Sequence, residues 1–218
     1  MSFQRARRDE QKAERRAGIL FRARDLCAEA GVMGWSLNEL GRRADITKSN
    51  LYRYFGSREE ILLILLHEET HRFATRLEAE TAGGPMTISQ LCGVIAQLYD
   101  QQPLLCDLLS VSASVLEQNI ALETIRDIKT DGQADSQRVA QAIARVLDGV
   151  DAGLAARISF ASGIIVAGLW PMASPDAPIR QLAVYDGLQH LDLDFRAELQ
   201  RMLEAQIAGM ACAPGGQS

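Results

Sequence analysis

The stretch WSLNELGRRADITKSNLYRYFGSREEIL, from Trp35 to Leu62, decides the fold of this 218-residue chain. Ser36 and Ser57 each have a glutamate three residues further on, which is the spacing of a capping box that opens a helix. Thr47 can cap another helix between them, and Asp45-Ile46 supplies a tight turn before it. The stretch therefore predicts three capped helices in close succession, of which the first two are short.

The second of these helices, expected from Thr47 to Phe55, has the composition of a helix that reads DNA. Leu51 and Phe55 are four residues apart, so both are expected to point into the core. Two short helices joined by a tight turn are typical of a helix-turn-helix, whose second helix enters the major groove. Lys48 and Arg53 are candidates for guanine or phosphate contacts and Asn50 for an adenine contact, and the hydroxyls of Ser36, Thr47, Tyr52 and Tyr54 suit phosphate oxygens.

The charge is distributed unevenly along the chain. Residues 1–58 contain 13 Lys and Arg against 7 Asp and Glu, whereas residues 59–218 contain 10 against 21. Such asymmetry favours a basic module that faces DNA or a membrane, joined to an acidic body. We therefore expect a helix-turn-helix DNA-binding domain over residues 1–58 and a ligand-binding and dimerisation domain over residues 59–218.

The remainder of the chain predicts helices almost throughout, because no long run alternates apolar and polar residues with β-branched enrichment. An all-α fold is expected, with helices over about 9–30, 36–44, 47–55, 57–82, 87–100, 103–118, 121–147, 151–170 and 194–210. Pro171, Pro175 and Pro178 indicate a loop before the last helix. The longest apolar stretch, Ile158 to Ala173, has 16 residues. It is shorter than the ~20 residues that span a bilayer, so we expect a buried helix there.

The segment from Ile19 to Leu62 resembles the DNA-binding domain of TetR-family transcriptional regulators, most specifically at LYRYFGSREEIL, residues 51–62. The resemblance implies that Thr47, Lys48, Ser49 and Tyr52 face DNA. Tyr54 stands where the family often has histidine and Arg58 where it usually has lysine, and both can donate to phosphate. Arg43 completes the predicted DNA-contacting set.

Two positions depart from the family pattern, and both lie near the turn. Gly41 replaces a usual alanine, which is expected to loosen the first helix of the motif. Asp45 replaces the usual turn glycine, although aspartate tolerates the left-handed conformation better than most residues.

The resemblance also implies a dimer whose body binds a small molecule. A two-fold homodimer on an inverted-repeat operator is expected, because a single reading unit with few base contacts binds weakly. Residues of about 153–170 and 194–210 are rich in Gly and Ala, so they suit a four-helix interface, or else pack within one chain. Tyr99, Leu105, Phe160, Trp170 and Met172 are the residues expected to line a ligand pocket, or else belong to the core. We expect a repressor that its ligand releases from DNA.

A rival interpretation rests on His67-Glu68-Glu69-Thr70-His71, which matches the HExxH pattern of zinc enzymes. On a helix the two imidazoles stand one turn apart and can bind Zn²⁺, with Glu68 as general base. The charged Glu69 and the lack of predicted strands for a substrate cleft argue against a hydrolase. A metal-responsive regulator or zinc hydrolase is kept as the alternative, and neither enzyme activity nor a cofactor is predicted.

The cysteines and the N-terminus indicate where the protein acts. Cys27, Cys92, Cys106 and Cys212 form no CxxC pair, and the charged N-terminus does not resemble a signal peptide, so reduced thiols in the cytoplasm are expected. The basic N-terminal helix lacks the aromatic anchors of a membrane-surface helix, so no membrane binding is expected.

Overall fold

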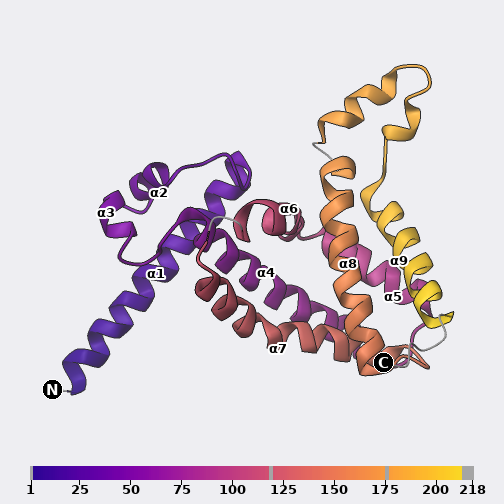
Figure 1. Ribbon diagram of the computed structural model, residues 1–218, viewed down its shortest axis with the longest axis horizontal. Helices are drawn as coiled ribbons and strands as arrows, with labels where there is room; N and C mark the ends of the chain where they lie inside the picture. The colour runs from indigo at the N-terminus through magenta and orange to yellow at the C-terminus, as the bar shows by residue number, and fades with distance from the viewer. Residues whose placement is uncertain (1, 118–119, 175–176, 213–218) are drawn as a thin grey trace.

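The computed structural model describes residues 2–117, 120–174 and 177–212, and every regular element in these ranges is a helix (Figure 1). The helices are α1 (Ser2–Ala30), α2 (Leu37–Arg43), α3 (Lys48–Leu51), α4 (Arg58–Glu80), α5 (Ile88–Asp100), α6 (Pro103–Val111), α7 (Leu122–Val146), α8 (Ala152–Ala173) and α9 (Phe195–Cys212). A π-helical turn, η1 (Ser112–Leu116), continues α6, and the 3₁₀ turns η3 (Pro178–Val184) and η4 (Gln189–Leu191) lie between α8 and α9. The predicted all-α fold is confirmed.

The predicted caps start the first short helices. The Ser36 hydroxyl accepts from the amide of Glu39 at 3.3 Å, Thr47 from that of Asn50 at 3.3 Å, and Ser57 from that of Glu60 at 3.0 Å. The Glu60 carboxylate accepts from the amide of Gly56 instead of closing a capping box on Ser57. A complete capping box joins Thr87 and Gln90 at the start of α5, where the sequence analysis did not predict one.

Three elements differ from the predicted ranges. Helix α1 begins at Ser2, earlier than the expected residue 9. The regular part of α3 ends at Leu51, and a turn carries the chain through Tyr54. Helix α8 continues past Pro171 to Ala173. Pro171 lies in the last turn of the helix, where it removes only one main-chain hydrogen bond, so the helix tolerates it.

The chain builds two hydrophobic cores, and α4 contributes to both. In the first, Leu26, Leu40 and Leu51 of α1 to α3 are buried together with Ile61 in the first turn of α4, and Leu108 and Leu116 of the body also belong to it. The second core lies among α4 to α9 and includes residues 73–77 of α4. The domain boundary at residue 58 stays a prediction, because the first core extends past it.

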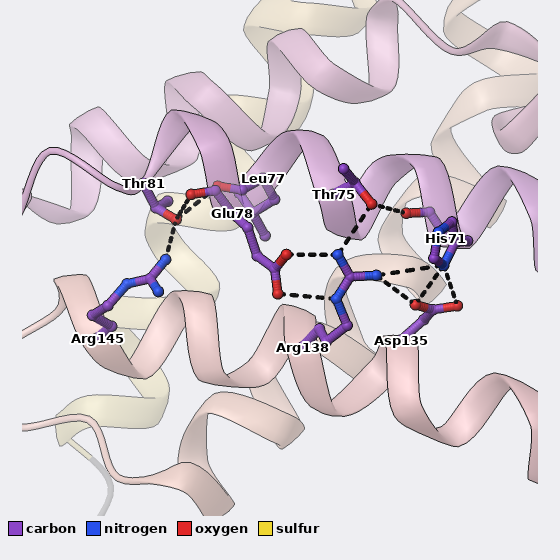
Figure 2. A network of polar contacts seen from close by, with 8 residues as sticks. All are labelled: His71, Thr75, Leu77, Glu78, Thr81, Asp135, Arg138 and Arg145. Carbon is purple, nitrogen blue, oxygen red and sulfur yellow. Dashed lines mark hydrogen bonds and ion pairs between the residues drawn. The ribbon is translucent and has the colours of Figure 1, made fainter.

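A polar network holds the C-terminal half of α4 against α7 (Figure 2). Arg138 donates to the buried carboxylate of Asp135 at 2.9 Å and to Glu78 at 2.6 Å, and His71 Nδ1 lies 3.0 Å from Asp135. Hydrogen bonds from Arg138 lower the pKa of Glu78 below its usual value. We call this network the α4–α7 clamp, and it comprises His71, Thr75, Glu78, Thr81, Asp135, Arg138 and Arg145.

Helix α8 packs against α6, α7 and α9, yet one of its faces is uncovered. We call this the α8 face, and it consists of Gly153, Ala156, Phe160, Ile164 and Gly168. The Phe160 side chain is 74% exposed and that of Ile164 is 58% exposed, so the expectation of a fully buried helix is wrong on this side. The helix has 22 residues, and among the described residues it is the one helix long and apolar enough to cross a membrane.

Three cysteines belong to the cores. Burial raises the pKa of the Cys27, Cys92 and Cys106 thiols, that of Cys92 to about 12. Thiols with so high a pKa are almost entirely protonated at neutral pH and react slowly. The side chain of Cys212 lies outside the described residues.

Candidate nucleic-acid interface

Helix α3 and the turn after it bury one side in the first core and expose the other side to solvent. Leu51 and Phe55 are 1% and 3% exposed and face the first core, as predicted. The opposite side, which we call the reading face, consists of Lys48, Ser49, Asn50, Tyr52 and Arg53. All five residues are exposed, and within the described part of the chain their side chains have no hydrogen-bond or ion-pair partner. The reading face therefore presents two cations, an amide and two hydroxyls that are free to meet a ligand.

Two other residues of the predicted DNA-contacting set are occupied within the protein. Arg43 makes a two-pronged ion pair with Glu29, at 2.7 and 2.6 Å, and this hydrogen bonding lowers the pKa of Glu29. Arg58 donates to the main-chain oxygens of Met33 at 3.3 Å and Trp35 at 3.0 Å. Both arginines thus connect the helices of the first core, and a phosphate contact by either stays a prediction.

The remaining members of the set flank the reading face. Ser36 and Thr47 are exposed, and each hydroxyl accepts from its helix while keeping its own proton to donate. Tyr54 is half-buried beside the first core. The geometry therefore makes the reading face the centre of the interface and these three hydroxyls its border.

The turn between α2 and α3 explains the two departures from the family pattern. Asp45 has a φ of +53°, in the left-handed region that the sequence analysis expected for a turn glycine. A Cβ atom on Gly41 would lie 2.7 Å from the carbonyl oxygen of Ile46. The turn therefore folds back too closely on Gly41 for a larger residue to fit without a shift of the backbone, and the looser first helix stays a prediction.

Replacing Asp45 with glycine is expected to stabilise the protein. A left-handed residue with a Cβ is strained by about 1 kcal/mol or more, which exceeds the entropy that glycine adds to the unfolded chain. We expect the unfolding temperature, measured by circular dichroism, to be highest for Asp45→Gly, intermediate for the wild type and lowest for Asp45→Ala. An alanine variant as stable as the glycine variant would contradict the strain argument.

The HExxH residues do not converge on one point. Glu68 accepts from Arg24 at 2.8 Å, and His71 belongs to the α4–α7 clamp. His67 faces Gly132 on α7 instead. Among the described residues no group of three His, Cys, Asp or Glu side chains is placed to hold a metal ion. The geometry therefore gives no support to the zinc alternative.

The five residues predicted to line a ligand pocket are separated in the structure. Tyr99 is buried and stacks on Phe73, with ring centroids 4.4 Å apart, and Leu105 is buried in the same core. Trp170 is buried and donates to Asp107 at 2.7 Å. Phe160 and Met172 are exposed on α8. Tyr99, Leu105 and Trp170 therefore belong to the core, which was the other possibility for these residues, and Phe160 lines a separate cavity of about 300 Å³ between α7 and α8. Ligand contacts by any of the five stay a prediction.

A cavity of about 620 Å³ lies between the N-terminal halves of α4 and α7. None of the five predicted lining residues contributes to it. Its walls are Leu63, Leu66, His67, Thr70, Glu117, Ile125, Arg126, Ile128, Lys129, Thr130, Gly132, Gln133 and Ser136. Small-molecule sites have volumes of roughly 300–1,000 Å³, so this cavity has room for a ligand. We call it the α4–α7 cavity, and it begins where the α4–α7 clamp ends.

Two family profiles match the chain over nearly its whole length. Bacterial regulatory proteins of the tetR family match residues 19–65, and the tetracyclin repressor-like C-terminal domain matches residues 67–214. Among curated proteins, none matches the chain.

Solved structures share the fold at low sequence identity. FadR of Bacillus subtilis in complex with stearoyl-CoA superposes with a TM-score of 0.56 at 18% identity, covering 88% of this chain and 98% of its own. FadR of Bacillus halodurans also has a TM-score of 0.56, at 15% identity, covering 89% and 95%. A TetR/AcrR regulator of Thermobifida fusca has a TM-score of 0.52 at 20% identity, covering 88% and 97%. The likeness extends through both cores.

Proposed function

Because this chain belongs to the tetR family of bacterial regulatory proteins, we propose that it is a dimeric transcriptional repressor that a small molecule releases from its operator. The observation that carries the proposal is the reading face, five exposed polar residues without partners on α3 and the turn that follows it, which Leu51 and Phe55 anchor in the first core. We expect the protein to act in the cytoplasm, where its DNA is.

The chemistry of the reading face suits the major groove. Lys48 and Arg53 are donors for guanine or phosphate, and Asn50 can both donate to and accept from adenine. The surplus of positive charge in residues 1–58 attracts the phosphate backbone, while the acidic body is repelled from it. Binding is therefore expected to weaken steeply as salt is added.

The α8 face supports dimerisation. Added Cβ atoms on Gly163 and Gly168 would meet nothing within 4 Å, so packing within one chain does not require these glycines. Small residues beside the exposed Phe160 and Ile164 let a second helix approach closely. Helix α9 lies beside α8 and exposes Met202, so the two helices of each subunit can form a four-helix interface.

The α4–α7 cavity is the proposed effector site. Leu63 lines this cavity and also belongs to the first core, which carries α3. A ligand that parts α4 from α7 therefore moves the helix on which the reading face rests, and it can favour a spacing of the two reading faces that no longer fits DNA. The stearoyl-CoA bound to the FadR neighbour supports an effector with a large apolar part.

The first experiment is selection of bound duplexes from a random DNA pool. We expect an enriched inverted repeat whose affinity falls about 10- to 100-fold in Tyr52→Ala, because each of two subunits loses a hydrogen bond worth about 1 kcal/mol. Tyr185→Ala is the matched control, since Tyr185 is similarly exposed but follows η3 in the body. Failure of folded wild-type protein to enrich any sequence at low salt would refute the proposal.

A further inference from the structure

We propose that the α4–α7 cavity takes an amphipathic carboxylate and that His67 is its polar anchor. This inference rests on the proposed function, because it names the chemistry of the effector. It follows from the character of the cavity walls, from a hydrogen-bonding group left without a partner in them, and from a glycine that packs beside the imidazole.

Aliphatic side chains of both helices line the cavity. Leu63 and Leu66 of α4 lie opposite Ile125 and Ile128 of α7. Such walls gain stability by excluding water from a hydrocarbon chain or ring, at roughly 25 cal/mol for each Å² of apolar surface that is buried. The main part of the ligand is therefore apolar.

The hydroxyl groups in the walls each donate a hydrogen bond to a main-chain carbonyl oxygen. Thr70 donates to the carbonyl of Leu66 at 2.8 Å, Thr130 to that of Arg126 at 2.8 Å, and Ser136 to that of Gly132 at 3.3 Å. These residues bond to their own helices, so none offers the ligand a free hydroxyl proton. A ligand that needs a donor must find it elsewhere in the cavity.

His67 contributes a hydrogen-bonding nitrogen that no other residue satisfies. Its Nδ1 atom is buried and has no hydrogen-bond partner among the described residues. A buried polar atom without a partner destabilises a protein, by about 1–3 kcal/mol, and the loss is recovered when a partner arrives. The imidazole lines the cavity beside Leu63 and Leu66, so a ligand that fills the cavity brings its polar group to this nitrogen when the ring shifts toward it.

Gly132 is the α7 residue that packs beside the buried Nδ1 atom. It lies inside α7, where glycine is less favourable than alanine by about 1 kcal/mol. A Cβ atom at this position would lie 3.3 Å from His67 Nδ1. Alanine would thus crowd the imidazole and hinder the small shift that opens Nδ1 to a ligand, although it would favour the helix.

The charges around the cavity select an anion. Arg126 and Lys129 line it, and their acidic partners, Asp127 and Glu117, are held in ion pairs that are largely exposed to solvent. Exposed ion pairs contribute little, so an incoming carboxylate can take either cation at small cost. A carboxylate only accepts hydrogen bonds, which matches an imidazole that offers an N–H together with two cations. A cationic ligand would find Glu117 as its one acidic wall residue, already paired.

The test compares three ten-carbon probes by titration calorimetry at neutral pH: decanoate, decanol and decylamine. We expect decanoate to bind about tenfold more tightly than decanol, as one charge-assisted hydrogen bond allows, and decylamine to bind most weakly. His67→Leu and Gly132→Ala should remove the preference for decanoate over decanol, and His67→Gln, which keeps a donor, should retain part of it. Gly18→Ala is the control, because its Cβ on α1 would meet nothing within 4 Å.

Stability measurements keep the variants interpretable. Gly132→Ala should unfold at or above the wild-type temperature, so loss of decanoate binding in it cannot be assigned to misfolding. Equal affinity for the three probes, no binding of any, or an unchanged preference in both cavity variants would overturn the inference. If decanoate binds as expected yet leaves the protein on its selected duplex, the ligand class stands and ligand-driven release fails, so the two proposals are tested separately.

Discussion

Replacing Phe160 and Ile164 with glutamate is expected to turn the proposed dimer into monomers and to remove tight operator binding. Burial of such a side chain against a partner contributes about 1.5–3 kcal/mol, and a two-fold interface counts each side chain twice. The two substitutions also bring unpaired carboxylates into a contact that excludes water, at a cost of several kcal/mol. Sedimentation velocity at micromolar concentration should then show a monomer.

The loss of DNA affinity follows from the loss of pairing. A single reading face binds one half-site, and linking two gains about 10²- to 10⁴-fold without any new contact. We expect a loss of that size on the selected inverted repeat and little change on an isolated half-site. Leu122→Glu with Val184→Glu is the matched control, because these side chains are 76% and 82% exposed outside the α8 face. A double variant at 160 and 164 that sediments as a dimer would exclude this interface.

Removing Glu69 is expected to destabilise the protein strongly. Its carboxylate is 5% exposed, 3.1 Å from Arg24 Nε and 2.8 Å from an Arg72 nitrogen. Gln102, at the start of α6, also donates to it at 3.4 Å. This single carboxylate therefore joins α1, α4 and α6. Glu69→Ala takes an acceptor from the buried Gln102 amide and from the part-buried Arg24 guanidinium, and we expect a loss of about 3 kcal/mol in the free energy of unfolding in urea.

Glu68 provides the control, because it pairs with the same arginine at 2.8 Å from a more exposed position. Glu68→Ala should cost no more than about 1 kcal/mol. The double change Arg24→Met with Glu69→Leu should recover much of the loss, since apolar residues often replace a buried ion pair without penalty. If Glu69→Ala and Glu68→Ala cost the same, burial of the charge does not govern the stability of this contact.

The parts of the fold that depend on neighbours in sequence were predictable. Ser36, Thr47 and Ser57 cap their helices because the group that each one satisfies lies three residues away. The inward direction of Leu51 and Phe55 follows from helical spacing alone. For the same reason the all-α class could be predicted from the pattern of apolar residues.

Contacts between residues far apart in sequence were not predictable. Glu69 meets Arg24 across 45 positions, and the cavity depends on how α4 and α7 diverge beyond the clamp. His67 and His71 are one turn apart, yet they meet different residues of α7, so the metal motif has no metal geometry. Gly132 looks like a defect in a helix until His67 is seen opposite it. No local pattern carries this information.

Helix α4 belongs to both cores, and this limits how the N-terminal DNA-binding domain can be transferred to another regulator. A cut after Arg58 would strip the first core of Ile61, Leu62 and Leu65 and of its contacts with Leu108 and Leu116. The isolated DNA-binding domain would then expose the apolar side chains of its core to water and precipitate or misfold. A working chimera must include α4 to beyond Leu65. Its recipient must have leucines where Leu108 of α6 and Leu116 of η1 stand in this protein. The junction between the two parts therefore lies within a helix and not in a loop.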